Sequence, residues 1–347
     1  MTTPATHGAG RAGDRGPTAL PAPAVLIALL SLLALAVIAS IAFGARVVSL
    51  SEILDGVTGH DSTIGAAAVG ERLPRTATAL VAGAALGLAG ALMQAITRNP
   101  IADPGILGIN TGASLAIVTG IAFLGIHSLF QYLWVAMAGA MITAIAVYAV
   151  GSLGPGGATP VKLALAGVAT GAALSSAISA IVLPRAQGLE DFRAWHVGSL
   201  GRGTWDSLGV VLPFIALATA AGLAMARPLN SLALGDEAAT GLGVNVPLTR
   251  LLAAAAGVVL CAAVTALAGP IGFVGLMVPH AVRMLTGPDH RWLLPLSVLG
   301  GAALLTAADT LGRVIARPSE ISVGIITAFV GAPILIVVAR SAKVREL

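Results

Sequence analysis

Few side chains in this sequence are suited to covalent or metal chemistry. Cys261 is the only cysteine, which excludes an intrachain disulfide, a cysteine-ligated cluster and a thiol redox pair. The six histidines show neither an H-E-x-x-H motif nor another metal-ligand spacing, so the sequence predicts no metal site and no cofactor. A membrane-embedded enzyme would need His, Asp and Glu gathered at membrane depth, and no such cluster is visible.

Nucleotide chemistry can be tested directly, because Lys162 and Lys343 are the only lysines. A phosphate-binding loop of the form G-x-x-x-x-G-K-[ST] needs a hydroxyl residue after the lysine. Here Leu163 and Val344 follow instead. The chain is therefore expected to be no enzyme, and any ATP-driven work must be done by a separate subunit.

Composition indicates the solvent in which the chain folds. Of its 347 residues 57% are hydrophobic and 10% are charged, and the mean hydropathy is +0.95. Soluble domains carry roughly 25% charged residues, so this balance predicts a bundle that turns apolar side chains toward lipid. The net charge of +4 does not indicate nucleic-acid binding, because the cations are spread singly along the chain.

The hydropathy pattern predicts about ten transmembrane helices. Residues 1–23 are expected to form a disordered cytoplasmic tail, and residues 24–43 are an uncharged run long enough to cross ~30 Å of hydrocarbon. Nine further runs lie at about 74–96, 106–125, 131–150, 162–183, 205–226, 247–268, 273–286, 292–314 and 322–340. A transmembrane domain of residues 24–342 and a C-terminal tail of residues 343–347 follow. An even number of crossings, with arginines near both ends, predicts cytoplasmic termini in a multi-pass protein of the plasma membrane.

Small residues recur at helical spacing, as in Gly83, Gly87 and Gly90. Such surfaces let helix backbones approach closely where lipid provides no hydrophobic drive for association. We therefore expect these glycines to lie in helix contacts.

Two segments at predicted helix ends are more polar than a plain span. In Arg72-Leu73-Pro74-Arg75 the proline suits a first helical turn, and the arginines are expected on the outer side, either as interfacial anchors or as contacts. Residues 97–108 contain two prolines and two glycines and are expected in the cytoplasm. They predict either a tight turn capped by Asn99 and Asp103 or a re-entrant or partner-contacting loop.

Two further segments contain breaks. Residues 230–247 are long enough for a short cytoplasmic helix around Asp236 and Glu237, ended by Gly241 or Gly243 in a left-handed conformation. Such a helix is a plain surface feature unless a partner docks on it. Residues 269–280 break a helix on the outer side, and His280 is expected to be a hydrogen-bonded packing residue.

In this order the four segments closely resemble the permease subunits of binding-protein-dependent ABC importers for iron-siderophores, haem and vitamin B12. The resemblance covers about residues 24–342 and rests on Arg-Leu-Pro-Arg, Asn-Pro-Ile-Ala-Asp-Pro-Gly-Ile-Leu-Gly, Leu-Gly-Asp-Glu-Ala-Ala and Gly-Pro-Ile-Gly-Phe-Val-Gly-Leu-Met-Val-Pro-His. It implies an all-α type II importer permease that pairs with a second permease, identical or homologous. Two ATPase subunits and an extracytoplasmic substrate-binding protein complete the implied assembly.

The resemblance also implies roles for particular residues. Docking of the binding protein is implied for Arg72, Arg75 and Arg313, because a guanidinium pairs with a carboxylate at two points. Arg313 has an alternative partner in Asp309, one turn earlier. Contact with the ATPase is implied for Ser231, Leu234, Gly235, Asp236, Glu237, Ala239, Gly241, Leu242 and Gly243. A cytoplasmic loop beside the pathway is implied for Asn99, Pro100, Asp103, Pro104 and Gly105. A broken helix is implied for Gly269, Pro270, Gly272, Phe273, Gly275, Pro279 and His280.

The function that this implies is import of an iron(III)-siderophore, chosen over haem and cobalamin on family frequency alone. An ion-coupled secondary transporter is the alternative from another class, and it would keep ionisable residues near the bilayer midplane. Asp309 is the nearest candidate for such a residue. Its closeness to Arg313 and to the outer boundary weakens that alternative.

Overall fold

The computed structural model describes residues 20–60, 63–100, 102–105, 108–154, 160–184 and 197–344. This part of the chain is helical and contains no strand, which confirms the all-α prediction. Most of the expected N-terminal tail and residues 345–347 lie outside it. The helices are α1 (Ala22–Ala42), α2 (Leu50–Thr58), α3 (Ile64–Thr97), α4 (Ile109–Leu124), α5 (Leu129–Gly151), α6 (Pro160–Val182), α8 (Trp205–Ala224), α9 (Ala226–Ala233), α10 (Asp236–Gly241), α11 (Val246–Ala268), α12 (Val274–Thr286), α13 (His290–Ile315) and α14 (Val323–Val344).

The predicted crossings correspond to helices of this bundle. Seven are long and apolar enough to cross a membrane: α1, α3, α5, α6, α8, α11 and α13. The apolar α4, the apolar part of α14 and the 13-residue α12 are shorter and bring the number to the expected ten. All ten fall within a few residues of their predicted bounds except for the start of α3.

The start of α3 differs from the prediction. The helix begins at Ile64, after Thr63 accepts a hydrogen bond from the backbone N–H of Ala66 at 3.1 Å. Pro74 therefore lies inside the helix, and its predicted place in the first turn was wrong. Charged residues near Arg72 made the segment look like a boundary, whereas in the fold that arginine is buried by contacts with the end of α1.

The short helix α2 was not predicted. It begins with a capping box in which the Ser49 side chain accepts from Glu52 N and the Glu52 carboxylate accepts from Ser49 N. This helix lies against the start of α3, where Gly56 contacts the backbone of Ala66. With nine residues it is too short for a hydropathy window to detect.

Glycines bring α3 and α13 into close contact. A Cβ atom on Gly83 would collide with the carbonyl oxygen of Gly301, and one on Gly87 would collide with that of Ser297. On the next turn of α3 Gly90 lies equally close to Gly275 of α12. The expected role of these glycines in helix packing is confirmed, and α3 with α13 forms the centre of the bundle.

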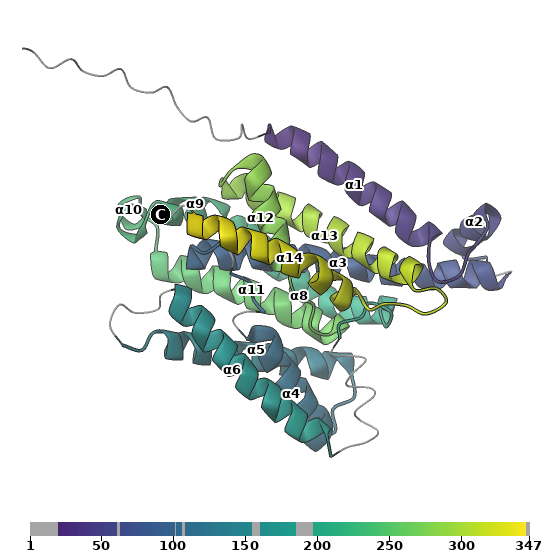
Figure 1. Cartoon of the computed structure of the whole chain (residues 1–347), viewed down its shortest axis with the longest axis horizontal. Helices are drawn as coiled ribbons and strands as arrows, with labels where there is room; N and C mark the ends of the chain where they lie inside the picture. The colour runs from purple at the N-terminus through teal and green to yellow at the C-terminus, as the bar shows by residue number, and fades with distance from the viewer. Residues whose placement is uncertain are drawn as a thin grey trace, which may run out of the picture.

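The two ends of the bundle can be named by their short helices, since α2 and α10 lie at opposite ends (Figure 1). At the α10 end the chain before α1 meets the end of α12, where Leu20 N donates to Leu285 O at 2.8 Å. The α2 end holds the end of α1, the start of α3 and the end of α13. The long helices α3, α11 and α13 run between these two ends (Figure 1).

Candidate functional sites at the two ends of the bundle

A cluster of charged residues joins three helices at the α2 end. We call Arg72, Arg75, Asp309, Arg313 and Glu320 the arginine cluster. Arg72 is only 7% exposed, and its guanidinium donates to the carbonyls of Ile41, Ala42 and Arg46 at 2.7–3.0 Å. The last carbonyls of a helix lack intrahelical partners, so this arginine binds the end of α1 to α3.

Arg75 lies one turn further along α3 and binds two carboxylates. Its Nε and Nη2 donate to the Asp309 carboxylate at 2.8–3.2 Å, and its Nη1 donates to Glu320 Oε2 at 2.7 Å. The Arg75 side chain is 13% exposed, Asp309 is 1% exposed and Glu320 is 40% exposed. The pair with Asp309 is thus buried, whereas the pair with Glu320 reaches the surface.

Arg313 completes the cluster from α13. Its Nε lies 3.0 Å from Asp309 Oδ2, so the pair expected one turn apart is present, although it is buried rather than exposed. The same guanidinium donates to the backbone carbonyl of Ser40 at 3.1 Å and to its Oγ at 2.7 Å. Asp309 therefore pairs with two arginines, of which the sequence predicted only Arg313.

A second candidate site lies at the α10 end and is formed by α9, α10 and the turns that follow each. We call residues 226–243 the coupling segment. It contains all nine residues expected to contact an ATPase: Ser231, Leu234, Gly235, Asp236, Glu237, Ala239, Gly241, Leu242 and Gly243.

The coupling segment exposes apolar side chains on either side of α10. Leu234 is 68% exposed and Leu242 is 64% exposed, whereas Ala239 is fully buried. Gly235 has φ 113° and Gly243 has φ 82°, conformations that L side chains rarely adopt. The expected left-handed stop is thus made by Gly243, and Gly241 is the last helical residue.

Asp236 at the start of α10 is engaged by this chain itself. Both guanidinium ends of Arg250 on α11 lie 3.0 Å from its carboxylate. Arg98, just after α3, also pairs with Asp236 and donates to Leu232 O at 2.7 Å. This carboxylate therefore fixes α10 against α3 and α11, a contact with no signal in the sequence because its partners are far apart in the chain.

The loop after α3 and the break before α12 meet inside the bundle. Asp103 is buried and accepts from Gly105 N at 2.7 Å, and its Oδ2 would lie 3.0 Å from a Cβ on Gly275. Nearby, Gln94 Nε2 donates to Gly275 O at 3.2 Å. The two segments were expected on opposite sides of the membrane. Gly275 belongs to the run at 273–286 that was expected to cross the membrane, and it meets Asp103 because the chain after α11 turns back into the bundle.

The predicted broken-helix residues follow this path. Gly269, Pro270, Gly272 and Phe273 lie in the non-helical connection between α11 and α12, and Gly275, Pro279 and His280 lie on α12. Phe273 has φ 69° and packs against Gly331 of α14. The Nδ1 atom of His280 is buried without a hydrogen-bond partner among the described residues, which corrects the expectation of a hydrogen-bonded histidine.

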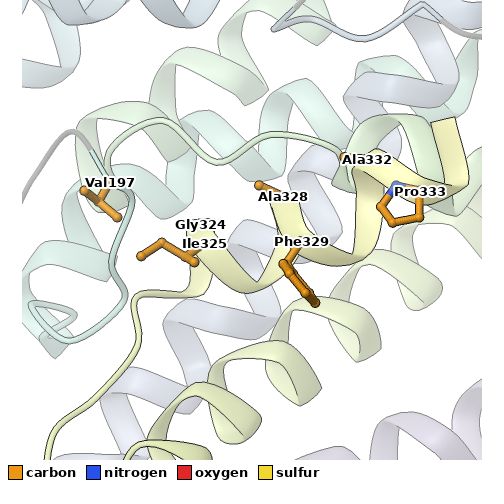
Figure 2. Close-up of a pocket in the computed structure, with 7 residues that line it drawn as sticks. All are labelled: Val197, Gly324, Ile325, Ala328, Phe329, Ala332 and Pro333. Carbon is orange, nitrogen blue, oxygen red and sulfur yellow. The ribbon is translucent and has the colours of Figure 1, made fainter. Parts of the chain in front are cut away.

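An apolar groove of about 590 Å³ runs along one face of α14 (Figure 2). Its lining is Val197, Gly324, Ile325, Ala328, Phe329, Ala332 and Pro333. Phe329 points away from the helix and is 81% exposed. In the described part of the chain no three His, Cys, Asp or Glu side chains gather as metal ligands would.

Comparison with known proteins identifies the class to which this bundle belongs. The family model described as the FecCD transport family matches residues 32–341. The ferric enterobactin transport system permease protein FepD of Escherichia coli (strain K12) is 46% identical over 316 residues, covering 90% of this chain and 93% of that protein. The probable siderophore transport system permease protein YfiZ of Bacillus subtilis (strain 168) is 40% identical, covering 91% and 95%.

A solved structure agrees with these relatives. It is described as an inward-facing conformation of a metal-chelate type ABC transporter and superposes with a TM-score of 0.77 at 29% identity. The match covers 92% of this chain and 99% of that one. The protein is thus a multi-pass membrane permease of an ABC importer. It belongs to the FecCD transport family, which sets aside the alternative of a secondary transporter.

Proposed function

We propose that this permease carries an iron(III)-siderophore inward across the plasma membrane, powered by a separate ATPase. The observation that carries the choice of substrate is the 46% identity, over 90% of the chain, to a permease named for ferric enterobactin. Two further relatives are named for siderophores or iron citrate and are 40% and 44% identical.

In the proposed orientation the α10 end faces the cytoplasm and the α2 end faces outward. Arginines lie at both ends of the bundle, so the orientation is proposed from the coupling segment, which resembles the ATPase-contacting element of the family. Both chain termini are then cytoplasmic. The arginine cluster then lies at the outward end of the bundle, with Glu320 as its most exposed member.

The coupling segment is the proposed docking site of the ATPase. Leu234 and Leu242 expose about two thirds of their surface at the end of the bundle, where a partner can cover them. Apolar side chains with a polar rim, here Glu237 and Ser231, are typical of protein interfaces. Asp236 has a different role in this proposal, because it fixes the segment in position through Arg98 and Arg250.

The arginine cluster is the proposed docking site of an extracytoplasmic binding protein. Arg75 is 13% exposed beside Glu320, which is 40% exposed, and in this proposal an acidic side chain of the partner competes with Glu320 for it. Arg72 and Arg313 are buried, and in this proposal they support the site by holding α1, α3 and α13 together.

A second permease is the proposed partner of the apolar groove on α14. Its lining contains no charged residue, and Phe329 projects from it. Two copies that face each other would enclose a pathway between them, and rigid tilting of the helices would open it to each side in turn. The loop with Asn99, Pro100, Asp103, Pro104 and Gly105 is proposed to border that pathway.

Haem or cobalamin is the alternative substrate. The hemin transport system permease protein HmuU of Yersinia pestis is 41% identical, and the cobalamin import system permease protein BtuC of Halobacterium salinarum is 43% identical. Both values lie below the 46% of the ferric enterobactin relative, and an uptake panel distinguishes the three substrates directly.

The test is uptake of radioactive iron on a panel of siderophores and as haem, together with labelled cobalamin, in cells with and without the gene. A loss limited to one siderophore class is the expected result. A loss of haem or cobalamin uptake alone would replace the substrate and keep the mechanism. Unchanged uptake of all of them would refute the proposal.

A further inference from the structure

Asn230 on α9 binds the start of α13 through three contacts. Its Nδ2 donates to Asp289 Oδ1 at 2.7 Å, and its Oδ1 accepts from the backbone N–H of His290 at 2.9 Å. The Nδ1 atom of His290 lies 2.8 Å from the same oxygen. One amide side chain thus bridges the coupling segment to the first turn of a long helix 59 residues further along the chain.

The orientation of this amide follows from its partners. A backbone N–H only donates, so the carbonyl oxygen of Asn230 must face His290, and the amide NH₂ is left for the Asp289 carboxylate. Hydrogen bonds from Arg291 lower the pKa of Asp289 well below its usual range. The carboxylate therefore stays ionised at neutral pH and holds the amide through a charge-assisted bond.

The helix that Asn230 binds runs to the opposite end of the bundle. α13 is helical from His290 to Ile315, with Pro295 in its second turn, and spans about 39 Å at 1.5 Å per residue. It carries Asp309 and Arg313 near its end. Glycines bring α13 into close backbone contact with α3, so the two helices are packed as a pair. Arg98 ties the end of α3 to the coupling segment through Leu232 O.

We propose that Asn230 is a positioning residue that clamps the coupling segment to α13, so that a push from the ATPase reaches the arginine cluster as a rigid movement of α3 with α13. This inference rests on the proposed docking of an ATPase at the coupling segment. It adds a specific mechanical link, which joins the two candidate sites through one side chain and one helix pair. Without the clamp the segment retains its docking face but loses its hold on α13.

The first test uses the transporter complex, isolated through a tag on this chain and reconstituted in liposomes. Asn230→Ala is expected to keep the ATPase bound and hydrolysing ATP, while the radioactive ferric siderophore moved per ATP falls by about tenfold, a typical size for coupling between sites. The matched control is Asn245→Ala, because the Asn245 side chain accepts from Leu248 N and so caps α11 locally. Normal cargo per ATP in Asn230→Ala would overturn the clamp.

A swapped pair separates positioning from simple destabilisation. Asn230→Asp alone places two carboxylates together and is expected to lose coupling. In the double variant with Asp289→Asn, the amide at position 289 can donate to the carboxylate at position 230. The second oxygen of that carboxylate can still accept from the backbone N–H of His290. Recovery of coupling in the double variant supports the clamp, and failure to recover in a folded double variant contradicts it.

The second test measures rigidity through spin labels at Arg227→Cys on α9 and Ile315→Cys at the far end of α13. Both positions are exposed, whereas the native Cys261 is buried and escapes labelling. The distance between the labels is expected to be the same with and without ATP in the parent chain and to change with ATP in Asn230→Ala. An ATP-dependent distance in the parent would overturn the inference. Loss of the ATPase from the isolated parent complex would instead refute the proposed function.

Discussion

Asp309 is the residue whose removal tests the architecture of the arginine cluster most directly. Its carboxylate is 1% exposed and receives Arg75 at 2.8 Å and Arg313 at 3.0 Å. Asp309→Asn removes the only buried negative charge of the cluster, which leaves Arg313 without a carboxylate partner and Arg75 with Glu320 alone. Breaking a buried ion pair from one side costs about 3–5 kcal/mol.

The loss is measurable as a shift in thermal unfolding. At ~2 °C per kcal/mol for a chain of this size, the expected fall in Tm is about 6–10 °C. The chain supplies its own reporter, since Cys261 is the only cysteine and is 1% exposed. A thiol-reactive fluorogenic dye added to the detergent-purified protein therefore reports unfolding without an introduced label.

The matched control is Glu320→Gln, which removes the half-exposed partner of Arg75. A surface pair contributes about 0–1 kcal/mol, so its Tm is expected to fall by no more than ~2 °C. If Asp309→Asn lowers the Tm as little as this control does, the reasoning that the cluster is a buried electrostatic centre is wrong.

Three further predictions concern packing and docking. Leu242→Glu is expected to reduce co-isolation of the ATPase by about tenfold with an unchanged Tm, because this exposed side chain contributes to an interface and not to the core. The control Leu54→Glu, which is similarly exposed on α2, is expected to keep the ATPase bound, and equal losses in both variants would refute the docking site. Gly301→Ala is expected to lower the free energy of unfolding by about 1–3 kcal/mol, because its Cβ would collide with a backbone carbonyl of α3. Gly209→Ala has open space around its Cβ and is expected to leave the Tm unchanged, so equal Tm values for the two variants would contradict the close helix contact. Gly241→Pro is expected to uncouple ATP hydrolysis from uptake by distorting the end of α10, and normal uptake would show that the turn is passive.

The spans were predictable because each depends on local composition. An uncharged run such as residues 22–42 must form its backbone hydrogen bonds within itself once in lipid, and a helix does so whatever its neighbours are. The short helix around Glu237 was likewise predictable from a capping glycine and helix-favouring alanines. The start of α3 was not, because the charges near Arg72 are compatible with a helix only when the end of α1 supplies their partners.

The sequence by itself therefore determined that this protein folds in a lipid bilayer, where its helices lie and in which order its four unusual segments occur. These features depend on hydropathy, capping and helix breaks along the chain. Only the tertiary structure decided which of those segments meet. It buried Asp309 between two arginines, brought Asp103 to Gly275 and placed Asn230 against Asp289. Such pairs lie far apart in the chain, and their energies depend on burial and on distances of a few ångströms, which no local pattern specifies.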